Sequence, residues 1–366
     1  KGMKNLTTLT LALLLTSFSF FAQNENGADL APKYSNEFLQ IGVGARSLGM
    51  SNSVVATTTD ITAGYWNPAG LLSLNDDLHV GLMHAEYFAG LAKYDYGAFA
   101  KKIDSTSAFG VSMIRFGVDD IPNTTELIDA QGNIDYDKIS TFSAADYGFI
   151  VSYARRIKNI DFGANVKIVH RKVGTFGRSW GFGIDLGARY VKNDWILGAT
   201  FRDVTTTFNA WSYSLSDQMI ETFTLTGNAI PQNSIELTLP RLLLGVARKI
   251  MVKEKFSILP ELDFDITFDG KRNTLIKTGF ASIDPHAGIE LGYNNLVFLR
   301  GGIGYLQYEM DVGGQEVLTV QPNIGIGVKI KRISLDYALT DLGDASVALY
   351  SNIFSLKFAL VKPDPS

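Results

Sequence analysis

Residues 41–72 read IGVGARSLGMSNSVVATTTDITAGYWNPAGLL, and this stretch decides how the rest of the chain is interpreted. It does not alternate between apolar and polar residues as a half-buried strand would. Small residues come first, a polar run at 57–60 follows, and the turn NPAG occupies 67–70. Asparagine before proline favours a turn, proline can open a short helix, and glycine can end one. We therefore predict a compact folded segment.

The chain after this segment alternates with period two. In 178–191 large apolar side chains alternate with glycine and charged residues, and in 254–268 they alternate with Glu261, Asp263 and Asp265. One face suits hydrocarbon, whereas the other carries charges that a bilayer excludes. A soluble sandwich also alternates, but with fewer consecutive aromatic residues. The pattern predicts an all-β fold, a transmembrane antiparallel β-barrel with residues 41–72 as a hatch inside its lumen.

About fourteen strands are expected, and an even number is the rule for bacterial barrels. They are placed at 77–86, 94–102, 107–118, 144–156, 160–171, 178–191, 193–203, 235–250, 254–268, 285–293, 296–309, 317–331, 333–341 and 349–361. Links after the even strands are short, whereas several links after the odd strands are long. This alternation is expected of periplasmic turns and extracellular loops.

The first residues have the features of an export signal. A lysine precedes an apolar core at 6–21, and Ala22 is a small exit residue, which favours a cleaved signal peptide over a short transmembrane anchor. We divide the chain into a signal peptide (1–22), a periplasmic N-terminal segment with the hatch (23–76), the barrel (77–361) and a C-terminal tail (362–366). The expected location is the outer membrane, with its lipids as partners.

Composition excludes several classes of protein. Net charge is −4, hydrophobic content is 46% and cysteine is absent, which argues against disorder, nucleic-acid binding, disulfides and thiolate metal sites. The four histidines show no ligand or catalytic spacing, and no nucleotide-binding or metalloprotease motif occurs. Residues 129–135 resemble a calcium loop only faintly, and a hairpin turn explains them better. We predict no enzyme, no cofactor and no metal.

The motifs GARSLGM (44–50), Asp60 and YWNPAGL (65–71) together resemble the hatch of FadL-like outer-membrane barrels. The closer resemblance is to the PorV/PorQ group of Bacteroidota, which is associated with type IX protein secretion. Its PorV members read NPAK where this chain reads NPAG, so the resemblance implies membership of the broad group. The hatch residues that it implies are Gly44, Ala45, Arg46, Gly49, Met50, Asp60, Trp66, Asn67, Pro68, Ala69, Gly70 and Leu71.

Charges within the hatch need partners because unpaired buried charge is costly. Arg46 and Asp60 are the obvious pair. Arg46 could instead pair with lumen acids such as Asp185 or Asp263. Either pairing would hold the hatch in place. Alternatively, these hatch charges could contact a passing ligand.

Two loops and two prolines are candidates for function. Loop 119–146 is strongly acidic, either as solvated surface or as a docking face. Loop 204–234 is rich in apolar residues, as either a partner surface or a lid; its candidate contact residues are Phe208, Trp211, Tyr213, Met219 and Phe223. Pro240 and Pro260 lie in neighbouring predicted strands, where they could open a lateral gap in the wall or form local bulges.

Three functions fit these features. The first is an outer-membrane platform that docks other outer-membrane or secreted proteins, in type IX secretion as the resemblance implies. The second is a passive transporter of small hydrophobic molecules, which could also take detergent into its lumen. The third is a scaffold subunit of another complex. A continuous apolar tunnel would favour transport, whereas a lumen blocked by the hatch and salt bridges would favour docking, and the lumen charges favour docking.

Overall fold

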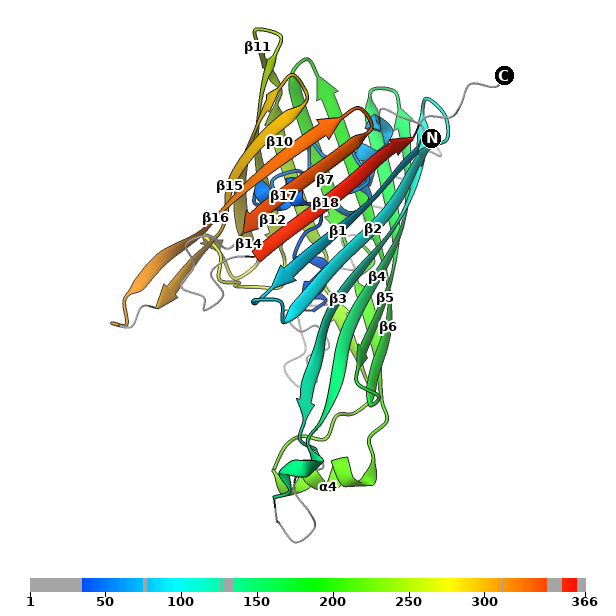
Figure 1. Ribbon diagram of the computed structural model, residues 1–366, viewed down its shortest axis with the longest axis vertical. Helices are drawn as coiled ribbons and strands as arrows, with labels where there is room; N and C mark the ends of the chain where they lie inside the picture. The colour runs from blue at the N-terminus through cyan, green and yellow to red at the C-terminus, as the bar shows by residue number, and fades with distance from the viewer. Residues whose placement is uncertain are drawn as a thin grey trace, which may run out of the picture.

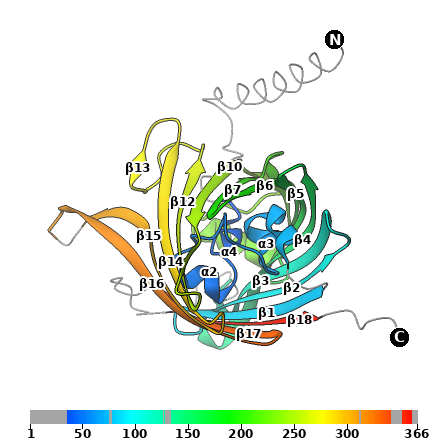
Figure 2. The ribbon, with the colours of Figure 1, turned by 90° about the horizontal axis from the view of Figure 1, so that it is seen from above.

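The computed structural model describes residues 35–74, 78–125, 127, 134–310, 313–340 and 351–360. Their strands form one antiparallel sheet that closes on itself, because β1 (Leu78–Tyr87) pairs with β2 (Ala92–Lys102) on one side and with β18 (Ser351–Leu360) on the other. Figure 1 shows this barrel from the side and Figure 2 from above. The predicted signal peptide, residues 23–34 and the tail 362–366 lie outside the described residues.

The barrel has fourteen strands, which confirms the prediction. The strands between β2 and β18 are β3 (Ser107–Asn123), β4 (Ser140–Ile157), β5 (Ile160–Val173), β6 (Gly177–Lys192), β7 (Trp195–Arg202), β10 (Arg241–Arg248), β12 (Phe256–Thr267), β14 (Ser282–Tyr293), β15 (Val297–Met310), β16 (Glu316–Ile330) and β17 (Ile333–Thr340). Short β11 (Ile250–Val252) continues β10 along β12, and β13 (Ile276–Lys277) forms a hairpin with β14.

Short and long connections lie at opposite ends of the barrel, as the sequence predicted. The turns after β2, β4, β6, β11, β14 and β16 are short and gather at the upper end in Figure 1. The lower end carries the long connections, which include η3 (Tyr136–Lys138) and α4 (Asp217–Leu225). We call the end with the short turns the turn end and the end with the long connections the loop end.

The two faces of the wall differ as the alternation requires. On β6, Trp180, Phe182 and Leu186 point outward and are exposed, whereas Asp185 and Arg189 point inward and are buried. The apolar outer face is suited to lipid, and the closed ladder leaves no sheet edge for lipid to cover. Among the described residues, no helix is both long and apolar enough to cross a membrane.

The hatch lies inside the ring of strands (Figure 2). It consists of η1 (Glu37–Leu39), α2 (Ala45–Gly49), α3 (Ala63–Trp66) and η2 (Pro68–Ser73). The predicted turn is present: the Asn67 side chain accepts a hydrogen bond from the Ala69 amide, and Pro68 opens η2. Short helices suit this segment because each helical turn satisfies some of the backbone N–H and C=O groups within the segment itself, without a partner from the wall.

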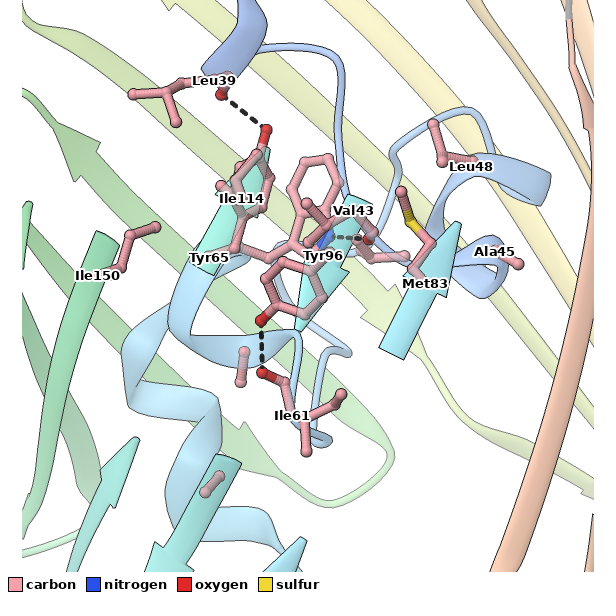
Figure 3. Packing of buried hydrophobic residues seen from close by; sticks show 14 of the residues in the cluster. Leu39, Val43, Ala45, Leu48, Ile61, Tyr65, Met83, Tyr96, Ile114 and Ile150 are labelled. Atoms are coloured by element: carbon pink, nitrogen blue, oxygen red, sulfur yellow. Dashed lines mark hydrogen bonds between the residues drawn. The ribbon is translucent and has the colours of Figure 1, made fainter. Parts of the chain in front are cut away.

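Aromatic side chains hold the hatch together and fix it to the wall (Figure 3). The Tyr65 hydroxyl donates to the Leu39 carbonyl at 2.7 Å, and the Trp66 indole donates to the Val43 carbonyl at 2.9 Å. From β2, the Tyr96 hydroxyl donates to the Ile61 carbonyl at 2.8 Å. Each buried aromatic therefore packs its ring and also satisfies a loop carbonyl.

Inward-facing glycines let the hatch backbone approach the strands. A Cβ added to Gly198 of β7 would lie 2.5 Å from the Val55 carbonyl oxygen, and a Cβ on Gly302 of β15 would collide with the Met50 backbone. A side chain at either position would force the hatch away from the wall. This close fit is a physical reason for the small residues on the inner face of the strands.

The region predicted as loop 204–234 is partly strand. β8 (Thr207–Tyr213) pairs with β6, and β9 (Ser234–Thr238) pairs with β8, so together they extend the wall beyond β7 and β10 towards the loop end. Residues 214–233 form the actual connection, which contains α4. The prediction was wrong here because residues 203–206 interrupt the alternation between β7 and β8.

Candidate functional site

A chain of alternating charges links the hatch to four strands and returns to the hatch. Arg46 of α2 lies 2.9 Å from Glu290 of β14, and Glu290 lies 2.6 Å from Arg300 of β15. Arg300 lies 2.7 Å from Asp336 of β17. We call the six groups of this chain, which are Arg46, Glu290, Arg300, Asp336, Lys357 and Asp60, the ionic chain.

Lys357 of β18 completes the ionic chain. Its ammonium lies 2.9 Å from the Asp336 carboxylate and 2.7 Å from the Asp60 carboxylate of the hatch. Positive and negative groups alternate along the whole ionic chain, so each charge has an opposite neighbour. Buried ions need this arrangement because their desolvation is otherwise uncompensated.

The predicted pair of Arg46 with Asp60 was therefore wrong, and so were Asp185 and Asp263 as partners of Arg46. The two hatch charges are the ends of the ionic chain. Burial works against the charge on Asp60, but the Lys357 ammonium and hydrogen bonds from Thr62 outweigh it and hold the pKa of Asp60 well below its usual range. Burial also disfavours the Arg46 charge, and the Glu290 carboxylate reverses this and raises the pKa of the guanidinium.

A second set of contacts holds the centre of the hatch. The Asp263 carboxylate accepts from the amides of Val54 and Val55 at 2.8 and 2.9 Å. Next to it on β12, Glu261 accepts from the Ala56 amide at 2.7 Å. These acids were predicted to face the lumen, and the structure shows that they bind backbone donors of the hatch.

From β6, which is separated from β12 by β7 and β10, Arg189 donates to the Ala56 carbonyl at 2.8 Å and to the Ser73 hydroxyl at 2.8 Å. The amide of Asn67 donates to the Val55 and Ala188 carbonyls at 3.1 and 3.0 Å. Residues 54–56 and the Asn67 turn are thus bonded to both β6 and β12. The wall supplies the hydrogen-bond partners of these polar groups of the hatch.

The predicted hatch residues converge on this arrangement. Gly49 abuts Gly325 of β16, the Ala45 amide donates to the Ser355 hydroxyl at 2.8 Å, and Leu71 is fully buried. An added Cβ on Gly70 would strike the Thr58 carbonyl oxygen, and Gly44 adopts a φ of 91° ahead of α2. All these contacts serve to hold the hatch in place.

The wall is irregular where β7 passes into β8. Leu186 of β6 pairs with Phe201 and Phe182 pairs with Phe208, so residues 203–206 are an insertion in the ladder. On the adjacent strand, residues 239–240 separate β9 from β10. Pro240 has no amide hydrogen to donate to a ladder. Both neighbouring strands are interrupted at the same height.

A buried lysine stands behind this irregularity. Lys167 of β5 lies 2.8 Å from Asp185 and 2.5 Å from Asp203, and the Asp203 amide donates to Asp185 at 2.9 Å. All three side chains are almost completely buried. The insertion therefore directs Asp203 into the lumen, where it shares the ammonium with Asp185.

A cavity of about 480 Å³ lies between the hatch and strands β10, β12, β14 and β15. Its walls combine the polar residues Arg202, Arg241, Asp263, Asp284 and His286 with apolar ones, namely Ile41, Val55, Trp66, Leu243 and Phe264. Two smaller cavities, of about 20 and 10 Å³, adjoin it through Arg241 and Gln40, and the smaller of these is lined by Leu239 and Pro240. The cavity is thus connected by shared lining residues to the wall irregularity.

Pro260 takes no part in the irregularity at Pro240. It pairs with Ile289 of β14, near the turn end of β12. Arg241, which follows Pro240, pairs instead with Thr267 at the other end of β12. The hypothesis that both prolines open one gap was therefore wrong, because antiparallel register places them at different heights of the wall. Pro240 alone lies at the irregularity.

The five residues predicted to contact a partner do not form one surface. Phe208 points outward on β8, whereas Trp211 and Tyr213 lie on the opposite face of that strand and stack at 5.7 Å. The Arg171 guanidinium lies over the Trp211 ring, whose indole donates to Glu236 at 2.8 Å. Met219 of α4 is buried, and Phe223 is half-buried. Most of this set packs against the barrel's own loop end.

Metal binding finds no support among the described residues, which hold no group of three or more histidine or acidic side chains suited to an ion. The faint calcium-like segment 129–135 lies largely outside the described residues. The charge partners that sequence reasoning missed are Lys167, Asp203, Glu290, Arg300 and Asp336. All but Asp203 stand between glycine or apolar neighbours in a predicted strand, and inward parity along the strand was the available signal. Asp203 follows the inward-facing Arg202, so parity does not predict its position.

No protein-family model and no curated protein sequence matches the chain. Solved structures with the same architecture do. The chain is similar to the CymD monoaromatic hydrocarbon channel, with a TM-score of 0.55 and 13% identity over 88% of this chain and 98% of that one. It is also similar to the P. putida toluene transporter TodX, with a TM-score of 0.54 and 14% identity over 88% and 99% of the two chains.

The Ralstonia pickettii toluene transporter TbuX gives a TM-score of 0.53 and 15% identity over 87% of this chain and 98% of that one. These likenesses extend over nearly the whole length of each compared chain. At such low identity they establish architecture and carry no substrate to this chain. The protein therefore shares the fold of these channels, a closed barrel of fourteen antiparallel strands with a helical N-terminal segment inside it.

Proposed function

We propose that this protein is an outer-membrane channel for small, poorly water-soluble molecules, which enter from the loop end and leave sideways through the wall. The observation that carries the proposal is the position of the 480 Å³ cavity beside the irregularity at residues 203–206 and 239–240. The hatch fills the direct route along the barrel axis. A molecule in the cavity therefore has the wall irregularity as its alternative exit.

The exit is closed in this structure. The cavity next to Pro240 has a volume of only about 10 Å³ and the one next to Asp203 about 20 Å³, which is the size of a few water molecules or less. Passage therefore requires residues 203–206 or 239–240 to move. These residues lie outside regular strand, so they can move without breaking an uninterrupted ladder.

The similar structures support this reading, since two of them are named as toluene transporters and one as a monoaromatic hydrocarbon channel. The charged residues in the cavity lining, Arg202, Arg241 and Asp263 among them, oppose an entirely apolar route. Lumen charges and a lumen blocked by the hatch and salt bridges were the features expected of a docking protein. The proposal therefore rests on the position of the cavity and on the shared architecture.

Uptake of radiolabelled toluene by cells producing the protein tests the proposal. Thr238→Trp would place a large ring at the buried end of β9, next to both small cavities. Ile235→Trp on the same strand is the matched control, because Ile235 is exposed on the outer face. The proposal predicts that Thr238→Trp reduces uptake to the level of cells without the protein and that Ile235→Trp does not.

Heat-modifiable mobility on denaturing gels must show that both variants form a barrel. Uptake that is equal in a folded Thr238→Trp barrel and in the wild type would contradict a lateral exit. Uptake by the wild type no faster than in cells without the protein would contradict the channel itself.

The second candidate is an outer-membrane docking component, in type IX secretion if the resemblance to the PorV/PorQ group holds. Exposed apolar residues at the loop end favour it: Ile220 and Leu225 of α4 and Ile230 beyond it are all exposed. Replacing Ile220 and Leu225 with serine should remove a co-purifying partner and leave toluene uptake unchanged. A partner retained by this variant would count against docking through α4.

A further inference from the structure

The turn end carries a ring of basic side chains. Thirteen lysines and arginines lie within five of its six turns and the adjoining strand ends, namely Lys101, Lys102, Arg155, Arg156, Lys158, Lys192, Arg248, Lys249, Lys253, Lys255, Lys329, Lys331 and Arg332. The same turns hold only four acids, Asp104, Asp161, Asp194 and Glu254. The sixth turn, at 294–296, is uncharged. We call these thirteen cations the basic collar.

The collar is free to bind an external partner. Within the described residues, only Arg156 of the collar forms an ion pair, with Asp161. All thirteen side chains are exposed except Lys102 and Lys329, which are half-buried. Since five of the six turns around the closed sheet carry them, the cations are distributed around the barrel and do not form a patch on one side.

Exposed aromatic residues adjoin the collar. Trp195 is 50% exposed, and the Arg248 guanidinium lies 5.4 Å from the centre of its ring. Phe256 and Tyr293 are also exposed and lie 4.9 Å apart. Aromatic rings with basic neighbours at the end of an apolar belt are typical of the level where a bilayer's hydrocarbon meets its headgroups.

We propose that the basic collar binds the phosphates of anionic phospholipids in the leaflet at the turn end. The distribution selects lipid over a protein partner, because a protein would contact one arc or the end of the barrel, whereas headgroups surround it at every turn. The long side chains can bend towards the headgroups while their stems cover apolar surface. A neutral headgroup offers no net charge for so many unpaired cations.

The test measures relative association of spin-labelled phosphatidylglycerol and phosphatidylcholine with the full chain reconstituted in phosphatidylcholine vesicles. The variant is Arg155→Glu, Lys249→Glu and Arg332→Glu combined, since these exposed residues lie in three different turns and none has a positive φ. The matched control replaces Lys138, Lys172 and Arg178 with glutamate; these are three exposed cations at the loop end.

The proposal predicts that the wild type prefers phosphatidylglycerol by about threefold or more at low salt, and that the preference weakens as salt is raised. The collar variant should lose the preference, and the loop-end control should keep it. Equal association of the two lipids with the wild type would overturn the proposal. It would also be overturned by a collar variant that keeps the preference, or by a control that loses it to the same extent.

Discussion

Lys357 of the last strand contacts Asp60 of the hatch, with the ammonium 2.7 Å from the carboxylate. The two residues are separated by almost the whole barrel sequence, yet the closure of β18 onto β1 brings them together. Lys357 also contacts Asp336 on the neighbouring β17. One side chain therefore joins the hatch to the seam where the barrel closes.

The opposite end of the ionic chain is Arg46, bonded to Glu290 of β14. The hatch is thus fixed through charges at two places, one on α2 and one ahead of α3. Between them, Glu261 and Asp263 bind the backbone at residues 54–57. Residues 46–60 are thus held at both ends and in the middle, so we expect the hatch to remain in the lumen as a plug.

Replacing Lys357 with methionine should loosen the hatch. The change leaves Asp60 and Asp336 without their shared cation, and removal of one partner from a buried ion pair costs about 3 kcal/mol. We expect faster amide hydrogen exchange at residues 60–66 and easier proteolysis of the hatch. Lys357→Arg keeps the charge and is the control, for which exchange should change much less. Unaltered exchange in Lys357→Met would show that the hatch does not depend on this contact.

Acid should weaken the Asp60 contact only at low pH. Because the folded-state pKa of Asp60 is depressed, its contribution to stability is complete above the unfolded-state value of about 3.9. The contribution declines as the pH falls below that value and disappears only below the folded-state pKa. The difference in unfolding free energy between wild type and Asp60→Asn in detergent should therefore be constant from pH 7 to about 5 and shrink below about 4. A difference that disappears near pH 6 would contradict the assignment.

Two adjacent glycines on β15 should respond differently to the same change. An added Cβ on Gly302 strikes the Met50 backbone, whereas one on Gly301 meets nothing nearer than 4.0 Å. We expect Gly302→Ala to destabilise the protein by about 1–3 kcal/mol through overpacking. Gly301→Ala should be neutral or slightly stabilising. Urea unfolding of both variants measures the difference, and equal stabilities would mean that the hatch does not press on β15.

The architecture could be predicted from the sequence because a lipid-facing strand repeats one rule along its length. Trp180 and Phe182 on one face and Gly181 and Asp185 on the other suffice to define β6 as a strand of this kind. The turn at Asn67 was predictable for a similar reason, since its preferences are local. The number of strands then follows from counting such segments, and the two ends of the barrel follow from the lengths of their connections.

The contacts of the hatch could not be predicted in this way. Arg46 was paired with Asp60 because they are close in sequence, but Glu290 and Lys357 reach them only through barrel closure and register. Pro240 and Pro260 looked adjacent for the same reason, and strand pairing separates them. β8 went unrecognised because residues 203–206 interrupt its alternation with β7. Each failure concerns barrel closure, strand register or an interrupted strand, on which local pattern carries no information.

Cysteine cross-linking tests most directly whether the hatch occupies the barrel. The chain has no cysteine, so Ala45→Cys with Ser355→Cys introduces one defined pair at a site where the Ala45 amide and Ser355 hydroxyl lie 2.8 Å apart. Ala45→Cys with Phe354→Cys is the control, because Phe354 points outward. Oxidation in intact membranes should link the first pair and leave the second unlinked. Failure of the first pair to link in a folded barrel, or equal linking of both pairs, would contradict a hatch held inside the lumen.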